Sequence, residues 1–447
     1  MAKEGADMAK ENDRMEKIVS LCKRRGFVYQ GSEIYGGLAG TWDYGPLGVA
    51  LKNNIKNIWW KMFVDSRDDM YGVDAAILMS SKVWEASGHV AGFSDPLVEC
   101  KKCKRRFRAD QVGDKCPECG GEFGEVRQFN MMFKTHIGAT EDEGSVSYLR
   151  PETAGGMFIN FKNVVDSFHP KLPFGLGQIG KAFRNEIAPR DFVFRSREFE
   201  QMEVEYFVRP TEWEGKFEEW RTAIHDFIAA IGIKKDGVHE LEVAEADRAH
   251  YSKRTIDFEF DFPFGRKELY GLAYRTDFDL KAHETASGQN LKYAPEGEEP
   301  FLPHVIEPSL GVDRTVLAVL ASAYTEDDLG GEVRTYLKFD PKVAPIKAAV
   351  FPLLKNKPEL VAKAREIYTM LKKEIPQVAW DDNGNVGKRY RRQDEIGTPW
   401  CITIDFDTLG EKPELKDTVT IRDRDTGEQK RVAIADLPSL LLPQIKV

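Results

Sequence analysis

The chain has 447 residues and a formal net charge of −9, and 42% of its residues are hydrophobic. This length allows two to four domains with sizeable cores, whereas the negative charge excludes a generally basic protein that coats nucleic acid. No run of 18 apolar residues occurs, so we expect no membrane-spanning segment, and the lack of an apolar signal-peptide core leads us to expect a cytoplasmic protein.

The charge is unevenly distributed along the chain. Residues 344–447 carry 18 basic and 16 acidic side chains, a net charge of +2, which leaves −11 on the rest. A folded tail that is less acidic than the body is consistent with a small RNA-contacting domain.

The first residues are polar and nearly repeat themselves, as Met1-Ala-Lys-Glu and then Met8-Ala-Lys-Glu. We expect residues 1–14 to form a polar N-terminal extension without chemistry of its own. Met15, Ile18 and Cys22 then recur at helical spacing, which predicts a helix after the extension.

Residues 26–48 are rich in glycine and predict tight turns. A helix is predicted after Pro46, and it carries large apolar side chains such as Leu51, Ile55 and Trp59. Such a helix needs a broad apolar partner, which is either the core of the same chain or a second subunit. From the residues alone, we favour the core.

Two Cys-x-x-Cys pairs separated by twelve residues predict a metal site in a zinc-ribbon-like insertion over residues 99–121. Thiolates at this spacing can surround a zinc ion tetrahedrally. Since cysteine fills all four positions, no open position remains for a catalytic water, and we expect a structural Zn²⁺ in a reducing compartment. The predicted ligands are Cys100, Cys103, Cys116 and Cys119.

Residues 178–206 predict two strands joined by a long loop. Because side chains alternate between the faces of a strand, Met202 lies on an apolar face, whereas Gln201 and Glu203 share a polar one. Small residues such as Gly180 on the first strand leave room above the polar face. The pattern indicates the floor of a ligand site.

The loop of this hairpin adds Arg190, Arg195 and Arg197, whose guanidinium groups suit phosphates, and Phe199 could stack on a base. This set favours a nucleoside triphosphate lying on the sheet. The alternative is that the arginines only pair with nearby carboxylates such as Glu186.

Residues 207–256 predict a helical, charge-rich insertion. Residues 303–323 predict a strand that ends at Glu307 and a helix opened by Gly311. Arg314 then lies in the first helical turn, beside free backbone amides and the positive end of the helix dipole. This position is suitable for binding a terminal phosphate.

Residues 326–345 predict a linker, and the alternating patterns beyond it predict a small α/β domain over residues 344–447. Its expected elements are a strand over 347–353, a helix over 358–374, a strand over 378–381, a helix over 386–396, a strand over 400–405 and a hairpin turning at Thr426-Gly427. The second helix carries basic residues that could meet RNA phosphates or form a solvated face. They are Lys388, Arg389, Arg391 and Arg392.

Phe183-Arg-Asn-Glu, followed by Phe194-Arg-Ser-Arg-Glu-Phe-Glu-Gln-Met-Glu, resembles motif 2 of the class II aminoacyl-tRNA synthetases, and the second half is similar to the glycyl members. The stretch around Pro46 resembles motif 1, the dimerisation element, and the helix start at Arg314 resembles motif 3. Arg150-Pro-Glu-Thr-Ala also matches the glycyl members. Gly397-Thr-Pro-Trp-Cys-Ile-Thr-Ile-Asp resembles the anticodon-binding domain that several of these enzymes share.

The resemblance runs from about Met15 and implies an α+β fold. A class II antiparallel sheet flanked by helices would occupy residues 15–335, and an anticodon-binding domain would occupy residues 344–447. The implied activity is the ATP-dependent attachment of glycine to its tRNA through glycyl-adenylate, in a cytoplasmic homodimer. Residues 207–256 would be a lid or a tRNA contact. The alternatives are a threonyl or prolyl synthetase, or a non-catalytic synthetase-like tRNA-binding protein.

The resemblance also implies roles for individual residues. Arg184 and Arg314 would be catalytic through their hold on the phosphates, and Glu268 could bind Mg²⁺ or be an ordinary surface carboxylate. The implied ATP-binding residues are Arg184, Asn185, Glu186, Phe194, Arg195, Ser196, Arg197, Glu198, Phe199, Glu268, Leu269, Gly311, Val312, Asp313 and Arg314. The implied glycine-binding residues are Arg108, Glu152, Phe199, Glu200, Gln201, Met202, Glu203, Glu307, Pro308, Ser309, Leu310 and Gly311.

Overall fold

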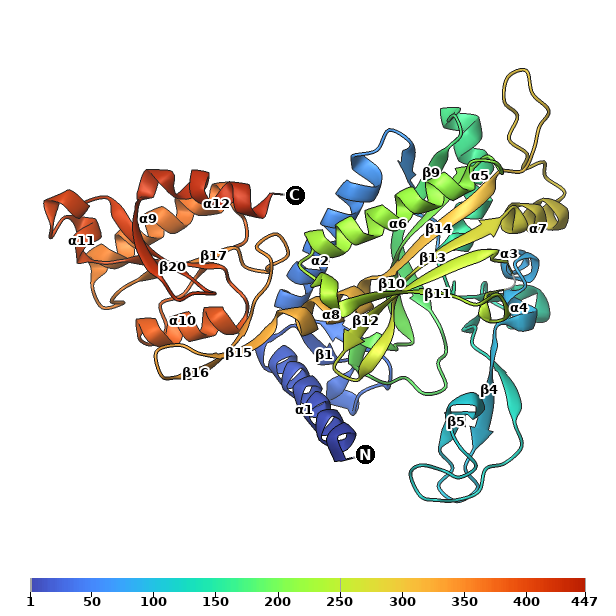
Figure 1. The fold of residues 1–447 in the computed structure, drawn as a ribbon, viewed down its shortest axis with the longest axis horizontal. Coiled ribbons are helices and arrows are strands. Elements are labelled where there is room, and N and C mark those ends of the chain that lie inside the picture. The colour runs from blue at the N-terminus through green and yellow to red at the C-terminus, as the bar shows by residue number, and fades with distance from the viewer. Residues whose placement is uncertain (1, 250, 447) are drawn as a thin grey trace.

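A seven-stranded sheet forms the centre of the larger body of the protein (Figure 1). The structure, a computed structural model, describes residues 2–249 and 251–446, and the side chains of residues 2–12 and 143 lie outside that description. The strand order is β11-β12-β13-β14-β10-β9-β3, and every pair is antiparallel except β3 with β9. The strands are β3 (Met70–Gly72), β9 (Phe174–Phe183), β10 (Glu198–Val208), β11 (Val238–Glu242), β12 (Arg254–Phe262), β13 (Gly265–Thr276) and β14 (His304–Gly311).

Three helices bury their apolar faces against one side of this sheet. They are α2 (Pro46–Trp60), α6 (Trp213–Ala230) and α8 (Val312–Ala323), and their buried side chains join those of β10, β12, β13 and β14 in one cluster. Leu51, Ile55 and Trp59 of α2 are fully buried, which confirms that this helix packs into the core of the chain itself. Among the described residues, no helix is long and apolar enough to cross a membrane.

A second apolar cluster lies where α5 (Ala154–Phe168) and α7 (Phe278–Ser287) meet β9, β10 and β14. The rings of Phe161, Phe174 and Phe207 pack against one another there, with ring centroids between 4.6 and 5.9 Å apart. This packing fixes the start of α5, which follows directly on Glu152 and Thr153, against the polar side of β10.

The cysteine-rich insertion is a small module built on a three-stranded sheet of order β5-β4-β6 (Figure 1, cyan). Its strands are β4 (Ser94–Glu99), β5 (Arg106–Arg108) and β6 (Arg127–Asn130). Two short helices, α3 (Ser81–Ala86) and α4 (His89–Gly92), precede it, and the hairpin of β7 (Lys134–His136) and β8 (Val146–Tyr148) follows it.

The C-terminal region forms a separate five-stranded mixed sheet of order β18-β17-β19-β20-β21, drawn in orange and red in Figure 1. Helices α9 and α12 pack on one of its faces and α10 on the other. The predicted strand and helix order is confirmed. The elements are β17 (Ala348–Pro352), α9 (Pro358–Glu374), β18 (Val378–Trp380), α10 (Val386–Glu395), β19 (Trp400–Ile404), α11 (Phe406–Leu409), β20 (Thr418–Asp423), β21 (Gln429–Ala433) and α12 (Leu437–Ile445).

Three expectations about local structure were wrong. The first helix, α1 (Ala2–Arg25), begins at Ala2 and so takes in the residues expected to be an extension. The expected linker over 326–345 contains an antiparallel hairpin of β15 (Tyr324–Asp328) and β16 (Val333–Leu337). The strand expected to end at Glu307 runs on to Gly311, so the helix that follows begins directly at the edge of the site.

The segment expected to be a helical insertion, residues 207–256, is part of the main body. It holds the end of β10, the helix α6 and the edge strand β11. Trp220, Phe227 and Ile231 are buried in the central core. Because this packing ties α6 to the sheet, the helix is part of a fixed wall and does not fit a lid, whereas the tRNA contact expected as the alternative stays a prediction.

Arg389 of α10 cannot meet RNA phosphates as expected, because its side chain is buried and donates to the backbone carbonyls of Asp382 and Gly384 at 3.1 and 2.7 Å. Arg391 and Arg392 are half-buried and pair with Glu332 and Asp381. Lys388 stays exposed on the outer face of this helix.

Gly48 in the first turn of α2 tests how closely that helix packs. A Cβ added there would lie 1.9 Å from the carbonyl oxygen of Phe27. We expect Gly48→Ala to lower the free energy of unfolding by about 2 kcal/mol or more, because backbone must move to admit the methyl group. Gly215→Ala in α6 is the matched control, since no atom lies within 4 Å of its Cβ. It should gain up to about 1 kcal/mol from helix propensity, and chemical denaturation of both variants measures the difference.

Candidate active site

The polar face of β9 and β10 forms the floor of the candidate site. The antiparallel register sets Gly180 opposite Gln201 and Ala182 opposite Phe199, as the alternation of side chains predicts. The room left at Gly180 is nevertheless filled from within the protein, because a Cβ there would meet the guanidinium of Arg150 at 2.3 Å. The glycine therefore admits the buried Arg150, which in turn donates to the carbonyl oxygen of Lys181 at 2.6 Å.

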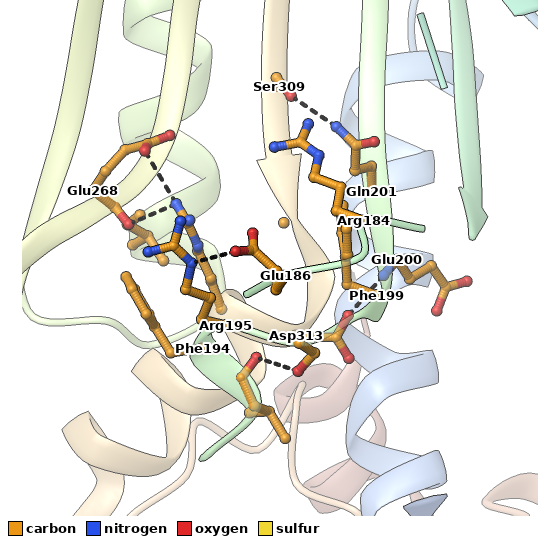
Figure 2. A pocket seen from close by; sticks show the side chains of 15 residues that line it. Arg184, Glu186, Phe194, Arg195, Phe199, Glu200, Gln201, Glu268, Ser309 and Asp313 are labelled. Carbon is orange, nitrogen blue, oxygen red and sulfur yellow. Dashed lines mark hydrogen bonds and ion pairs between the residues drawn. The ribbon is translucent and has the colours of Figure 1, made fainter. Parts of the chain in front are cut away.

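A cavity of about 330 Å³ opens above this floor (Figure 2). Its lining comes from β9, β10, the loop between them, β13, β14 and the start of α8, so segments more than 120 residues apart in sequence share one wall. The lining residues are Arg184, Glu186, Val193, Phe194, Arg195, Ser196, Phe199, Glu200, Gln201, Glu268, Leu269, Ser309, Gly311, Asp313 and Arg314.

Arg184 stands at the end of β9 with its guanidinium between two aromatic rings. Its Cζ lies 5.3 Å from the ring centroids of both Phe93 and Phe199, and its Nε donates to the carbonyl oxygen of Pro151 at 3.0 Å. These contacts leave other guanidinium nitrogens directed into the cavity (Figure 2). An arginine held in this way is ready to bind an anion.

Two further arginines line the cavity, and each is paired with a carboxylate; Figure 2 shows the first of them, Arg195, pointing toward Glu186. Arg195 Nε lies 2.9 Å from Glu186 Oε2. Arg314 Nη1 lies 3.2 Å from Glu268 Oε2, and its guanidinium stacks over the ring of Phe194, with 4.5 Å from Cζ to the centroid. The pairing foreseen as an alternative for these arginines therefore exists, and it coexists with a cavity that they line.

Asp313 links the start of α8 to the floor. Its carboxylate accepts hydrogen bonds from Tyr44 Oη at 2.6 Å and from the backbone N–H of Glu200 at 2.7 Å. Lys52 and Lys56 of α2 approach the carboxylate of Glu200 at 2.9 and 3.1 Å. Burial alone would raise the pKa of Glu200, but these lysines lower it. Glu200 thus anchors α2 to the sheet.

A group of buried carboxylates continues the floor away from the arginines. Glu203 accepts hydrogen bonds from Ser309 Oγ at 2.6 Å and Gln201 Nε2 at 3.1 Å, and also from Thr153 Oγ1. Burial, followed by the charge of Glu152, raises the pKa of Glu203. Its orientation is therefore set by three hydrogen bonds from neighbouring side chains.

Glu307 lies beside the buried Arg275, whose Nη1 donates to its Oε1 at 2.6 Å, while the rest of the guanidinium pairs with Asp279 at 2.8 Å. Burial is the largest effect on Glu307 and raises its pKa to about 8, although Arg275 opposes the shift. Neither carboxylate oxygen of the adjacent Glu205 has a hydrogen-bond partner among the described residues, and burial raises its pKa well above the ordinary value. The region is rich in carboxylates and suits a small cation.

Glu152 lies at the turn before α5 and faces His89, with 3.4 Å between its Oε2 and the ring Nε2. Burial alone would raise the pKa of Glu152, but His89, Arg275 and Arg184 together bring it down to about 2. Glu152 is therefore an ionised carboxylate beside Arg184.

Several predicted site residues do not reach the cavity with their side chains. Met202, Leu310 and Val312 are fully buried in the core behind the sheet, and Pro308 lies on the same side as Leu310, because alternate residues of a strand share a face. These side chains face away from the cavity, and the assignment of their positions to ligand binding stays a prediction.

Other predicted residues shape the loop around the cavity. Arg197 donates to the carbonyl oxygens of Ala39 at 2.7 Å and Glu186 at 3.0 Å, which closes the loop. Glu198 is exposed and pairs with Lys181.

Asn185 and Arg108 also lie outside the lining. Asn185 is held through its backbone N–H, which donates to Met131 O at 2.8 Å. Arg108 is engaged by Asp95 and Asp110 within the cysteine module.

Sequence reasoning missed Arg275, Asp279, His89 and Thr153. A charged residue inside the apolar run of β13 was a usable signal for Arg275. His89 and Thr153 carried no such signal, because their partners come from other parts of the chain.

The four predicted metal ligands come together as expected. Their sulfur atoms all lie within 4.8 Å of one another, with 3.5 Å between Cys100 and Cys119 and 3.6 Å between Cys103 and Cys116. Gly121 packs against the cluster, since a Cβ there would meet Cys100 Sγ at 3.0 Å. The cluster could hold a metal ion, and a set of four thiolates suits zinc.

Comparison with known families agrees with this geometry. The family model described as "tRNA synthetase class II core domain (G, H, P, S and T)" matches residues 133–323, and the one described as "Anticodon binding domain" matches residues 347–443. An antiparallel sheet carrying the arginine-lined cavity, joined to this C-terminal domain, defines a class II aminoacyl-tRNA synthetase.

Curated relatives narrow the class further. The chain is 50% identical to the glycine–tRNA ligase of Clostridium acetobutylicum, over 98% of this chain and all of the relative. It is 52% identical to that of Lachnospira eligens, over 95% and 97%, and 50% identical to that of Caldanaerobacter subterraneus, over 97% and 98%. The chain belongs to the glycine–tRNA ligase family.

Proposed function

We propose that the protein activates glycine with ATP and transfers it to the terminal ribose of its tRNA. The observation that carries this proposal is the juxtaposition, on one sheet, of an arginine-lined cavity and a floor of buried carboxylates. The first part suits a triphosphate and the second suits an ammonium group. We also propose a catalytic domain over residues 15–335 and an anticodon-binding domain over residues 344–447.

In the proposed first step, a carboxylate oxygen of glycine attacks the α-phosphorus of ATP and pyrophosphate leaves in line. Arg184 would bind the α-phosphate, and Arg195 and Arg314 would bind the outer phosphates after exchanging their present partners, Glu186 and Glu268, for phosphate oxygens. Such catalysis consists of positioning and charge neutralisation. In the second step, a ribose hydroxyl of the tRNA attacks the glycyl carbonyl carbon and AMP leaves.

The remaining ATP contacts follow the shape of the cavity. Phe199 would stack on adenine and Glu186 would accept from its amino group once Arg195 has turned to phosphate. Glu268 stands at the cavity mouth beside Arg314, where it would hold Mg²⁺. Bound Mg²⁺ would supply charge neutralisation for the leaving pyrophosphate.

Glycine would be selected by its ammonium group and by its size. Glu152, Glu203 and Glu307 would receive the ammonium group, with Ser309 and Gln201 orienting Glu203. A bound cation would relieve the mutual repulsion of these buried carboxylates. A substrate side chain would have to occupy the space in which Gln201 and Ser309 form hydrogen bonds to Glu203. Larger amino acids would therefore be excluded by steric clash.

Zinc is the proposed ion of the cysteine cluster, with a structural role. Four cysteine thiolates would fill the coordination sphere of the ion, so no open coordination position remains for a water molecule or a substrate. We also propose a cytoplasmic location, which the free thiols among the described residues and the proposed role in protein synthesis support.

A homodimer is the proposed assembly, formed through the loop that precedes α2. Ile34, Tyr35 and Leu38 lie close together in sequence and are 88%, 87% and 55% exposed. Exposed apolar side chains gathered in this way are typical of a protein interface.

The amino-acid dependence of ATP–pyrophosphate exchange tests the activity. We expect exchange with glycine alone, and Arg184→Ala should lower the rate by about 100-fold or more because a fixed phosphate ligand is lost. Arg190→Ala is the matched control, since Arg190 belongs to the same loop and lies outside the cavity lining. Exchange with threonine or proline would identify another synthetase, and no exchange by folded protein would support a non-catalytic tRNA-binding role.

Metal analysis tests the zinc site. The purified chain should hold about one zinc per protein, and Cys103→Ser should lose most of it because a thiolate ligand is missing. Cys401→Ala is the control, since Cys401 is buried in the C-terminal sheet far from the cluster and its loss should leave the zinc content unchanged. Equal zinc content in the two variants would contradict the assignment.

Light scattering after size-exclusion chromatography tests the dimer. Tyr35→Asp should shift the protein toward monomer, because a charge would be buried in the interface. Val333→Asp serves as the control, since Val333 is 78% exposed on the β15–β16 hairpin, away from the proposed interface. A monomeric parent protein, or an unchanged dimer in Tyr35→Asp, would refute this surface.

A further inference from the structure

The two short helices ahead of the cysteine module bring His89 against the candidate site. His89 Nε2 lies 3.4 Å from Glu152 Oε2, and both side chains are largely enclosed, at 13% and 14% exposure. The same short segment, residues 87–93, hereafter the strap, carries Phe93, whose ring lies against the guanidinium of Arg184. One segment therefore touches both a carboxylate and an arginine of the site.

The ring of His89 is held from its other side. Its Nδ1 lies 2.8 Å from Ser87 Oγ, whereas the carbonyl oxygen of Trp84 lies farther from that hydroxyl, at 3.4 Å. The single proton of the Ser87 hydroxyl suits the shorter contact to Nδ1, and a neutral imidazole then carries its own proton on Nε2, which faces Glu152. The ring of Trp84 meets the imidazole at 5.5 Å with an interplanar angle of 79°.

The strap itself is tied to the cysteine module. Asn130 Nδ2 donates to the carbonyl oxygen of Val90 at 2.9 Å, and the backbone N–H of Met131 donates to Phe93 O at 2.9 Å. His89 is thus fixed at its ring and at its backbone. Fixed donors of this kind orient the groups that they face.

Glu152 depends on this contact more than the other carboxylates of the floor do. Burial would by itself favour the neutral form of Glu152, and His89 is the strongest of the groups that keep its pKa low. Glu203 is instead held by three hydroxyl or amide donors, and Glu307 is held by Arg275.

We infer that His89 is a positioning residue for glycine: its Nε2 holds the Glu152 carboxylate in the orientation that receives the ammonium group of the substrate. This inference rests on the proposed function. It assigns to the strap a part in amino-acid binding that is separate from ATP binding, because Glu152 lies beyond the residues that line the ATP cavity.

Two substitutions separate this role from simple packing. His89→Gln keeps an N–H donor of suitable reach but removes the aromatic ring, whereas His89→Phe keeps a ring against Trp84 and Phe93 but removes the donor. If the donor matters, glutamine should preserve glycine binding and phenylalanine should not. If only packing matters, the order should be reversed.

The experiment is steady-state ATP–pyrophosphate exchange with glycine and ATP varied separately. We expect His89→Phe to raise the KM for glycine by about tenfold or more, as the loss of a charge-assisted hydrogen bond implies, with kcat and the KM for ATP within about threefold of the parent. His89→Gln should stay within about threefold of the parent in all three constants. His239→Asn is the matched control, because His239 forms a 2.8 Å pair with Asp261 at the far edge of the sheet and should have no effect.

Ser87→Ala provides a second test that leaves the ring in place. It should raise the KM for glycine in the same direction by a smaller factor, because Nδ1 loses its partner. A parent-like KM for glycine in His89→Phe, or equal changes in the constants for glycine and ATP, would overturn the inference. Absence of glycine-dependent exchange in the parent protein would instead overturn the proposed function, and the inference with it.

Discussion

The pairing of β9 with β10 is the constraint on which the candidate site depends. Its register puts Gln201 and Glu203 on the face of the site and Met202 and Val204 in the core. A slip by one residue would exchange the two faces. Each buried apolar side chain contributes about 1.5 to 3 kcal/mol, and the slip would also bury carboxylates behind the sheet, so hydrophobic packing holds the polar face in place.

Burial has a second consequence on the polar face, which is an imbalance of charge. Glu203, Glu205 and Glu307 come close together around the guanidinium of Arg275, and the pKa of each carboxyl is raised by burial. Glu152 is the exception because His89 and two arginines face it. A cationic substrate group would complete this arrangement, since it stabilises the charged forms that burial disfavours.

The arginines on the other side of the cavity are poised differently. Arg195 and Arg314 are partly exposed and already paired with Glu186 and Glu268. Ion pairs at partly exposed positions contribute only about 0 to 1 kcal/mol, so phosphate oxygens can displace these carboxylates at little cost. The pairs keep the guanidinium groups near their working positions, and the ring of Phe194 supports that of Arg314.

The sequence by itself determined the features that depend on short spacings. The cysteine cluster follows from two Cys-x-x-Cys pairs, the polar and apolar faces of β10 follow from strand alternation, and the helix Pro358–Glu374 was predicted to the residue. Local sequence is sufficient in these cases because each pattern reports a period of the backbone or the reach of a few bonds.

Only the tertiary structure decided which distant groups meet. Arg150 fills the space at Gly180, Arg275 pairs with Glu307, and His89 reaches Glu152 across more than sixty residues of sequence. The charge pattern of α10 could not show that Arg389 turns inward, because the carbonyl groups that bind it belong to the preceding loop. These contacts depend on how strands and helices pack, and a side chain's partner is set by the path of the whole chain rather than by its own neighbours.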